Sequence, residues 1–304
     1  MPEKGRLRLY LSSLRLGRWP RSLAIFPGVV AVLIVRPESY PYGLMRLDSL
    51  LKVMLAFGLT WAVSTANYII NEITDAPFDA FHPGKRHRPL VQKEISWKIL
   101  MLLWLILVFL SSVLAFLFFR PDFMLALASL LIAGALYNVK PVRVKDIPYL
   151  DSTLESANNP IRFLIGWFVI ETAFPPFTLL LCWWAFGNFL MVGKRVAEKK
   201  FLSPEESSGY RISLKKYTIP GLIRFMGFNG VLFLSMFSLF ALRFRLKILL
   251  YALPLIIFYL VIFMVKSVQD RDTAEEPEKL LRNPFFALYT VFLACIFILA
   301  VLLR

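Results

Sequence analysis

Three oxygen-bearing side chains recur every four residues at the end of one long apolar run. They are Asn71, Asp75 and Asp79. On an α-helix this spacing stacks side chains on one face, with a drift of about 40° per step. Oxygen ligands of this kind suit Mg²⁺, which keeps several waters and bridges to substrate phosphates. The cluster therefore predicts a metal site with Asp75 and Asp79 as catalytic residues. A solvated helix end is the alternative. Pro77 predicts that the helix ends or kinks there, which would place Asp79 on the exit turn.

A dense cationic loop follows this cluster directly. Lys85, Arg86 and Arg88 lie within four residues of one another. Arg grips phosphate oxygens with two parallel hydrogen bonds, and Lys adds a point charge. Acids for a metal and bases for the free phosphate oxygens together predict a diphosphate clamp. The alternative is that the loop charge only orients the chain in a membrane. Neither histidine is expected to bind the metal, and His82 is expected to support the loop.

A second polar group lies further along the chain, where an apolar run is interrupted by charges. Asp151 and Glu155 are four apart and so share a helix face. Ionisable groups inside a membrane span are candidates for function. We expect Asp151 to act catalytically and Glu155 to complete a second metal site, or the group to position another substrate. The bases expected to bind substrate here are Lys140, Arg143 and Arg162. The alternative is a network within one helix, joining Asp151, Glu155 and Arg162, that only packs the bundle.

A third group ends a later apolar run with the sequence Gly193-Lys194-Arg195-Val-Ala-Glu198. Lys194, Arg195 and Glu198 are candidate substrate-binding residues. The alternative is a helix C-terminus at which cations are favourable. Arg21, in the basic segment near the start of the chain, is a further candidate for binding the substrate.

The elements that position these residues are long apolar runs. The chain of 304 residues is 58% hydrophobic with a mean hydropathy of +0.64, above the 45–50% that is typical of soluble domains. A span needs about 20 apolar residues. The sequence predicts one all-α bundle of about nine membrane-spanning helices, forming a single transferase domain over residues 1–304. The expected spans are Ser22–Val35, Leu50–Ile70, Ile99–Phe119, Phe123–Asn138, Leu150–Ile170, Phe174–Val192, Ile219–Leu242, Ile248–Val265 and Phe285–Leu303.

The charges predict the orientation of this bundle. The net charge is +15, and Lys and Arg gather in the N-terminal segment and in alternate loops. By the positive-inside rule we expect the N-terminus and the clusters to be cytoplasmic, in a protein of the plasma (inner) membrane. Only Arg243, Arg245 and Lys247 disagree. Basic loops between apolar runs indicate membrane lipids as partners and no nucleic acid. No cleavable signal peptide is expected, and Cys182 and Cys295 do not predict a disulfide.

These motifs resemble the UbiA superfamily of membrane transferases. Asn71-x-x-x-Asp75-x-x-x-Asp79 is similar to its first acidic motif, and Lys85 to Pro89 is similar to the Lys-Arg-x-Arg-Pro element that follows. The resemblance covers nearly the whole chain. It implies about nine transmembrane helices, two acidic motifs on the cytoplasmic side, and Mg²⁺ as the cofactor.

Within this superfamily the chain most resembles the decaprenyl-phosphate phosphoribosyltransferase subgroup. The matching stretches are His82 to Pro89, Phe189 to Glu198, Arg211 to Thr218, Glu276-Pro-Glu278, and Arg15, Trp19 and Arg21. Glu72 stands where the superfamily usually has Asp. Leu16 and Ser22 replace residues of the subgroup's entry motif, and the second acidic pair is Asp151 and Glu155 instead of two aspartates.

Two transfer reactions fit this resemblance. In one, phosphoribosyl pyrophosphate gives its 5-phosphoribosyl group to a polyprenyl phosphate. In the other, a polyprenyl diphosphate gives its prenyl group to an aromatic quinone precursor or a lipid, with Asp151 as a general base for a phenol. The subgroup motifs favour the first. A lipid transporter is a remote third alternative. The intramembrane charges of a transporter would lie near the bilayer midplane, whereas the acids here lie at the end of a helix beside a basic loop.

Overall fold

The computed structural model describes residues 3–39, 47–81, 84–201, 211–269 and 283–303, and every regular element in these ranges is a helix. The 3₁₀ helices are labelled η and the others α. The first unit of the fold contains α1 (Glu3–Ser13), η1 (Leu16–Ile25), α2 (Phe26–Val35), η2 (Pro37–Ser39), α3 (Leu47–Asp79), α4 (Trp97–Phe118), α5 (Pro121–Asn138) and η3 (Val144–Asp146). The later helices are α6 (Leu150–Ile170), α7 (Phe177–Phe201), α9 (Ile212–Lys216), α10 (Ile219–Arg243), α11 (Lys247–Tyr251), α12 (Leu253–Gln269) and α14 (Pro284–Leu302).

The described helices confirm an all-α integral membrane protein. Seven segments of the described chain are long and apolar enough to cross a membrane: Gly5–Val35, α3, α4, α5, α7, α10 and α14. The helix α12 is apolar but shorter. The charged span expected over Leu150–Ile170 is also a helix, α6, with the same bounds. The expected number of about nine is therefore approximate.

Two helices extend beyond the apolar runs that predicted them. The helix α3 continues through Pro77 to Asp79, so the whole acidic motif is helical and the proline does not end the helix before it. Pro77 lies in the last turn, where losing one backbone hydrogen bond disturbs little of the helix. The helix α7 continues from Val192 to Phe201 and carries the third polar group with it.

One predicted span is divided in two. The run Ile248–Val265 forms α11 and α12, and Ala252 separates them. Pro254 is the second residue of α12, and it has no N–H with which to continue the hydrogen bonds of α11. A new helix therefore starts at this point, since proline is well tolerated in a first turn.

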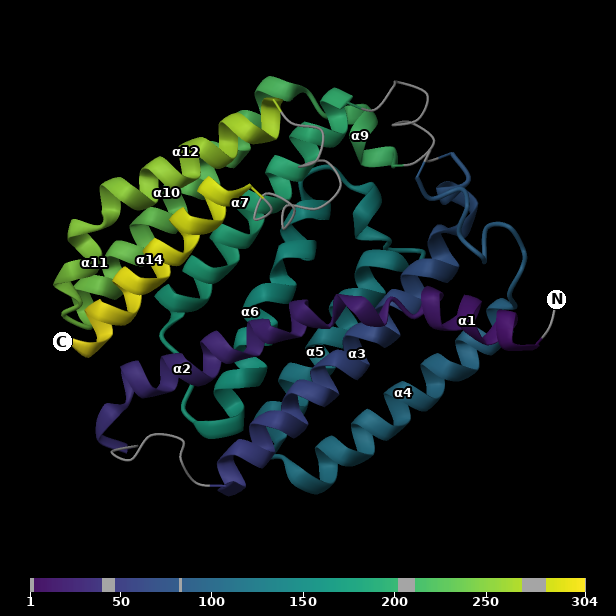
Figure 1. Ribbon diagram of the computed structural model, residues 1–304, viewed down its shortest axis with the longest axis horizontal. Helices are drawn as coiled ribbons and strands as arrows, with labels where there is room; N and C mark the ends of the chain where they lie inside the picture. The colour runs from purple at the N-terminus through teal and green to yellow at the C-terminus, as the bar shows by residue number, and fades with distance from the viewer. Residues whose placement is uncertain (1–2, 40–46, 82–83, 202–210, 270–282, 304) are drawn as a thin grey trace. The chain divides into compact units, whose positions relative to one another are not determined.

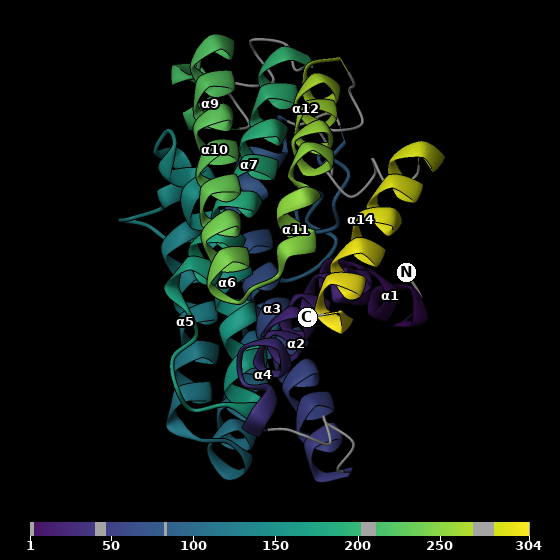
Figure 2. The same ribbon diagram turned by 90° about the vertical axis from the view of Figure 1, so that its left-hand side faces the viewer.

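The Cα positions group into two compact units. The first contains residues 1–147, 158–174 and 208–211, and the second contains residues 148–157, 175–207 and 212–304. The prediction of a single transferase domain is not tested by this grouping. In the first unit, α3 packs against α4, α5 and η1, as the purple, blue and teal ribbons of Figure 1 show. In the second, α7 packs against α10 and α12, which run alongside one another in Figure 2.

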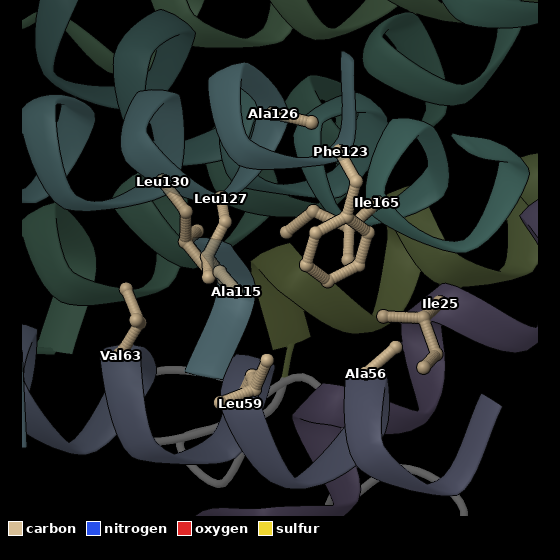
Figure 3. Close-up of a cluster of buried hydrophobic side chains, with 10 residues drawn as sticks. All are labelled: Ile25, Ala56, Leu59, Val63, Ala115, Phe123, Ala126, Leu127, Leu130 and Ile165. Carbon is tan, nitrogen blue, oxygen red and sulfur yellow. The ribbon is translucent and has the colours of Figure 1, made fainter. Parts of the chain in front are cut away.

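A hydrophobic cluster holds the helices of the first unit together. Leu59 and Val63 of α3 face Phe123 and Leu130 of α5, with Ile165 of α6 beside them (Figure 3). Phe123, Leu130 and Ile165 are fully buried. In a membrane such close packing, more than exclusion from water, holds helices side by side. This core fixes the helix that carries the acidic motif.

Two glycines let η1 and α2 approach α6 closely. A Cβ at Gly166 would lie 1.9 Å from the carbonyl oxygen of Ile25, and one at Gly28 would lie 2.0 Å from that of Phe163. Any side chain at either position would overlap backbone. Small residues at such crossings are typical of membrane helix pairs.

Candidate active site

Asn71 and Asp75 lie together on α3, as their spacing predicts. The Asn71 amide donates a 2.9 Å hydrogen bond to Oδ2 of Asp75 and a 2.7 Å bond to Oδ1 of Asn138, at the end of α5. Both motif residues are partly exposed. The amide oxygen of Asn71 and the carboxylate of Asp75 thus present oxygen ligands on the same helix face.

Two cations from the segment after α5 meet the Asp75 carboxylate. Lys145 pairs with it directly, and Nη2 of Arg143 lies 3.4 Å from Oδ1. Lys145 also donates a 3.0 Å hydrogen bond to Asn138. Burial lowers the pKa of Lys145, while the neighbouring Asp75 carboxylate acts in the opposite direction. Arg143 was predicted as a substrate-binding residue, whereas Lys145 and Asn138 were not among the predicted site residues.

Asp79, the last residue of α3, pairs through Oδ2 with Arg88 of the cationic loop. Its side chain is almost fully buried, and its other oxygen, Oδ1, has no hydrogen-bond partner among the described residues. Buried carboxylate oxygens are normally satisfied by a donor or a cation. This oxygen is therefore suited to a metal ion or its water.

The donor set fits Mg²⁺ better than a metal that needs an all-protein cage. Within the described ranges, no group of three or more His, Cys, Asp or Glu side chains is placed to hold a metal ion by itself. Asp75, Asp79 and the Asn71 amide supply two carboxylates and one amide oxygen. Mg²⁺ is commonly bound by one or two carboxylates, with waters and substrate phosphates completing its shell.

Glu72 is a further residue of this site that the sequence interpretation missed. It is buried, and it pairs with Arg15 and, at 3.4 Å, with Nη1 of Arg88. Arg88 therefore joins Glu72 to Asp79. Arg15 also lies 3.5 Å from Oδ1 of Asn71. The family resemblance already pointed to both residues. It marked Glu72 only as a departure from Asp, and Arg15 only as part of an entry motif.

Cations outnumber carboxylates around the motif. The carboxylates are Glu72, Asp75, Asp79 and Asp146, and the cations are Arg15, Arg88, Arg143 and Lys145 in ion pairs together with Lys85 and Arg211 acting at longer range. Six cations against four carboxylates leave an excess of two positive charges. A group with this balance attracts an anion.

The remaining predicted bases of this unit have varied surroundings. Lys85 is half-buried and acts electrostatically on Asp79. Arg86 is exposed and donates a hydrogen bond to His87, and Lys140 is exposed as well. His82 and the Glu276-Pro-Glu278 stretch lie outside the described residues. For these bases, a role in binding substrate stays a prediction.

In the second unit, Arg195 is fully buried and contacts three carboxylates. Its Nε lies 2.8 Å from Asp151, its Nη2 2.5 Å from Glu155 and its Nη1 2.8 Å from Glu198. The second acidic pair and the third polar group, predicted separately, therefore form one cluster. Arg195 lies well before the end of α7 at Phe201, and Lys199 and Lys200 occupy the last turn. The helix-end interpretation suits those lysines better.

Asp151 is the most enclosed carboxylate of this cluster. Besides Arg195 it accepts hydrogen bonds from the Ser213 hydroxyl at 3.2 Å and from the Tyr217 hydroxyl. Burial raises the pKa of Tyr217, and the adjacent Asp151 carboxylate raises it further. These contacts favour a supporting role over proton transfer. The roles predicted for Asp151, Glu155, Lys194 and Glu198 in catalysis or binding remain untested.

Arg162 does not join the network within α6 that was the alternative for the second polar group. Nη2 of Arg162 donates a 3.2 Å hydrogen bond to the Ser64 hydroxyl of α3, and the side chain makes no ion pair within the described ranges. Asp151 and Glu155 pair with Arg195 instead. The intrahelical interpretation of Arg162 is therefore wrong.

The structure thus combines a bundle of apolar helices with a helical Asn/Asp motif beside a cationic loop, as we predicted for a membrane-embedded transferase. Residues 24–201 match the UbiA prenyltransferase family. The chain belongs to this family, as its motifs predicted.

A curated relative and two solved structures are similar to the chain. The decaprenyl-phosphate phosphoribosyltransferase of Mycolicibacterium smegmatis is 25% identical over 219 residues, which cover 71% of this chain and 65%, less than two thirds, of that relative. A UbiA homologue from Archaeoglobus fulgidus, bound to GPP and Mg²⁺, has a TM-score of 0.67 at 20% identity and covers 96% of this chain and 99% of its own. A digeranylgeranylglyceryl phosphate synthase structure has the same TM-score and identity over 99% of this chain and 100% of its own. These structures show a shared fold.

Proposed function

We propose that the protein transfers the 5-phosphoribosyl group of phosphoribosyl pyrophosphate to a polyprenyl phosphate, in a Mg²⁺-dependent reaction. The observation that carries this proposal is the cationic excess around Asn71, Asp75 and Asp79, with Oδ1 of Asp79 buried and unpaired among the described residues. The similarity to a phosphoribosyltransferase supports this donor over others. We propose further that residues 1–304 act as a single transferase domain.

In the proposed reaction, an oxygen of the lipid phosphate forms a bond to C1 of the ribose. The bond from C1 to the pyrophosphate oxygen breaks, and pyrophosphate leaves with the electron pair. Charge therefore builds up on the leaving group. Preorganised cations stabilise such charge because they need not reorganise during the reaction. A phosphate nucleophile is already ionised and needs little or no general base.

Individual residues take the following proposed roles. Asn71, Asp75 and Asp79 would hold Mg²⁺, which supplies positive charge for the leaving pyrophosphate. The pyrophosphate oxygens would be held by Lys85, Arg86, Arg88, Lys140 and Arg143. Lys145 pairs with the Asp75 carboxylate, and it would help to hold a phosphate oxygen beside the metal site. Arg195 would support Asp151, Glu155 and Glu198.

Prenyl transfer is the second candidate function. It is favoured by the shared fold with the Archaeoglobus homologue that binds GPP and Mg²⁺. The same clamp would hold a prenyl diphosphate, and an aromatic or lipid acceptor would capture the prenyl group. Both candidate reactions use a diphosphate-bearing donor and a metal. They differ in the group that is transferred, which is phosphoribosyl in one and prenyl in the other.

One assay separates the two candidates. Membranes containing the protein receive Mg²⁺, labelled phosphoribosyl pyrophosphate and a polyprenyl phosphate, and the label that enters the lipid phase is measured. We expect label transfer by the wild type and its loss in Asp75→Ala, with Glu94→Gln, an exposed loop carboxylate, as the control. Absence of label transfer, together with prenylation of an aromatic acceptor from a prenyl diphosphate, would contradict the first proposal.

A further inference from the structure

A second group of cations lies along α3, away from the acidic motif. The cations are Arg18 and Arg21 of η1 and Arg162 of α6, and they are joined by Ser64 and Tyr68 of α3. These five residues are here called the Arg162 cluster. The helix η1 packs along α3. Because a 3₁₀ helix has three residues per turn, Arg18 and Arg21 fall on one face of η1, and Arg15 directly precedes this helix.

Arg15 and the two arginines of this face are followed here from the acidic motif along α3. Arg15 contacts Asn71 and Glu72, and the guanidinium of Arg18 lies 5.7 Å from the centre of the Tyr68 ring. Arg21 acts electrostatically on Arg162, which is hydrogen-bonded to Ser64. Ser64 precedes Asn71 by seven residues, about 10 Å along the helix axis. The cations thus extend from the acidic motif into the membrane-spanning part of α3.

Arg162 is the member of the cluster that needs a further partner. Its side chain is only 9% exposed, its Nε is buried without a hydrogen-bond partner, and no carboxylate pairs with it in the described part of the chain. A buried guanidinium without a counter-charge is costly within a membrane span. The nearby positive charge of Arg21 increases that cost. An anion placed between these groups would offset both effects.

We propose that the Arg162 cluster binds a phosphate monoester, separately from the diphosphate held at Asp75 and Asp79. Arg162 and Arg21 would pair with the phosphate oxygens, and Tyr68 and Ser64 can donate hydroxyl hydrogen bonds to them. The inference rests on the proposed function, whose substrates include two such groups: the 5-phosphate of the sugar donor and the headgroup phosphate of the lipid acceptor. A prenyl diphosphate donor carries no phosphate monoester in addition to its diphosphate.

Binding to the purified full-length protein in detergent tests this proposal. The probes are ribose 5-phosphate, farnesyl phosphate and pyrophosphate with Mg²⁺, each titrated calorimetrically. Arg162→Met removes the charge and keeps an apolar side chain of similar length. We expect it to weaken at least one monoester by about tenfold or more, as for loss of a charge-assisted hydrogen bond. Binding of Mg²⁺ with pyrophosphate should stay unchanged.

The two sources of phosphate give different results. Weakening for ribose 5-phosphate alone assigns the cluster to the donor, and weakening for farnesyl phosphate alone assigns it to the acceptor. Unchanged binding of both monoesters, or no binding of either to the wild type, overturns the proposal. Arg120→Gln, at an exposed arginine beside α5, is the matched control.

A structural role for Arg162 predicts a different outcome. A packing role requires that Arg162→Met lowers the melting temperature of the ligand-free protein, whereas an unpaired buried charge requires that it stays the same or rises. If that variant does not fold, Arg21→Gln, at a partly exposed position, should weaken the same monoester several-fold. Asp75→Asn tests the diphosphate clamp separately, because its effect falls on pyrophosphate and not on the monoesters.

Discussion

Glu72 connects two arginines that are far apart in the sequence. It holds Arg15 from the N-terminal segment and Arg88 from the cationic loop, and Arg88 also pairs with Asp79. A buried carboxylate that pairs with two guanidiniums sets their direction. Glu72 is thus a positioning residue for the cations that face the substrate.

Substituting Glu72→Gln should therefore weaken the binding of the substrate more than it slows the reaction. We expect the KM for the diphosphate-bearing donor to rise about tenfold, as for the loss of one to two charge-assisted contacts, with a smaller change in kcat. Steady-state kinetics over a range of donor concentrations measures both. Glu72→Asp should restore part of the affinity. A fall in kcat at unchanged KM would contradict a positioning role.

Tyr217 should make the stability of the protein depend on pH. Its hydroxyl donates to the buried Asp151 carboxylate, and its pKa is raised. Since the pKa of tyrosine in an unfolded chain is about 10, this protonated hydroxyl stabilises the fold fully below pH 10. The stabilisation is lost as the pH rises through the folded-state pKa.

Tyr217→Phe should accordingly lower the free energy of unfolding by about 2 kcal/mol at pH 8. The gap between wild type and variant should narrow above about pH 10. Thermal unfolding in detergent at pH 8 and at pH 11 measures it, with Tyr251→Phe, at an exposed tyrosine, as the control. A gap that stays constant across this range would show that the raised pKa does not contribute to stability.

The sequence predicted which residues belong to the site better than it predicted which residues contact one another. Spacing on one helix predicted that Asn71 and Asp75 would face one side, because i and i+4 are neighbours on any helix. Lys145 reaching Asp75, and Arg195 joining Asp151 to Glu198, depend on how separate helices pack. Such pairs need tertiary geometry, which one sequence does not provide.

At the scale of the elements, the crossing at Gly166 is the most restrictive contact in the first unit. Gly166→Ala would place a Cβ 1.9 Å from the backbone carbonyl oxygen of Ile25. We expect a loss of at least about 3 kcal/mol in stability, since backbone cannot move aside as a side chain can. The melting temperature in detergent and the yield of folded protein measure this loss.

Gly227 in α10 provides the matched control for that crossing. A Cβ at Gly227 meets nothing within 4 Å. Gly227→Ala should therefore leave stability unchanged or raise it by up to about 1 kcal/mol, because alanine favours a helix over glycine. Equal losses of stability in the two variants would show that the close approach of η1 to α6 is not what excludes a side chain at Gly166.

Element ends were harder to predict than element positions. Apolar runs located the helices, but α3 and α7 continue past those runs into the polar motifs. Hydropathy detects the part of a helix that matches lipid and not the part that extends beyond it. The division of α11 from α12 was readable in principle, since Pro254 lies within that run.

For the whole molecule, charge determines how the bundle lies in the membrane. The net charge of +15 is concentrated in the N-terminal segment and in the loops that contain Lys85 to Arg88 and Arg143 to Lys145. We propose that these segments face the cytoplasm of a plasma membrane, since Lys and Arg in short loops favour that side. A cytoplasmic position would also give the acidic motif access to a soluble phosphorylated donor and to Mg²⁺.

Labelling of single cysteines tests this orientation. Gln92 is exposed in the cationic loop between α3 and α4, and Thr172 is exposed between α6 and α7. In a chain without its native cysteines, Cys182 and Cys295 each becoming serine, Gln92→Cys and Thr172→Cys would be treated in intact cells with a membrane-impermeant maleimide. We expect only Thr172→Cys to react, and Gln92→Cys to react after the cells are opened. Labelling of Gln92→Cys alone in intact cells would reverse the orientation, and it would place the acidic motif where a cytoplasmic donor could not reach it.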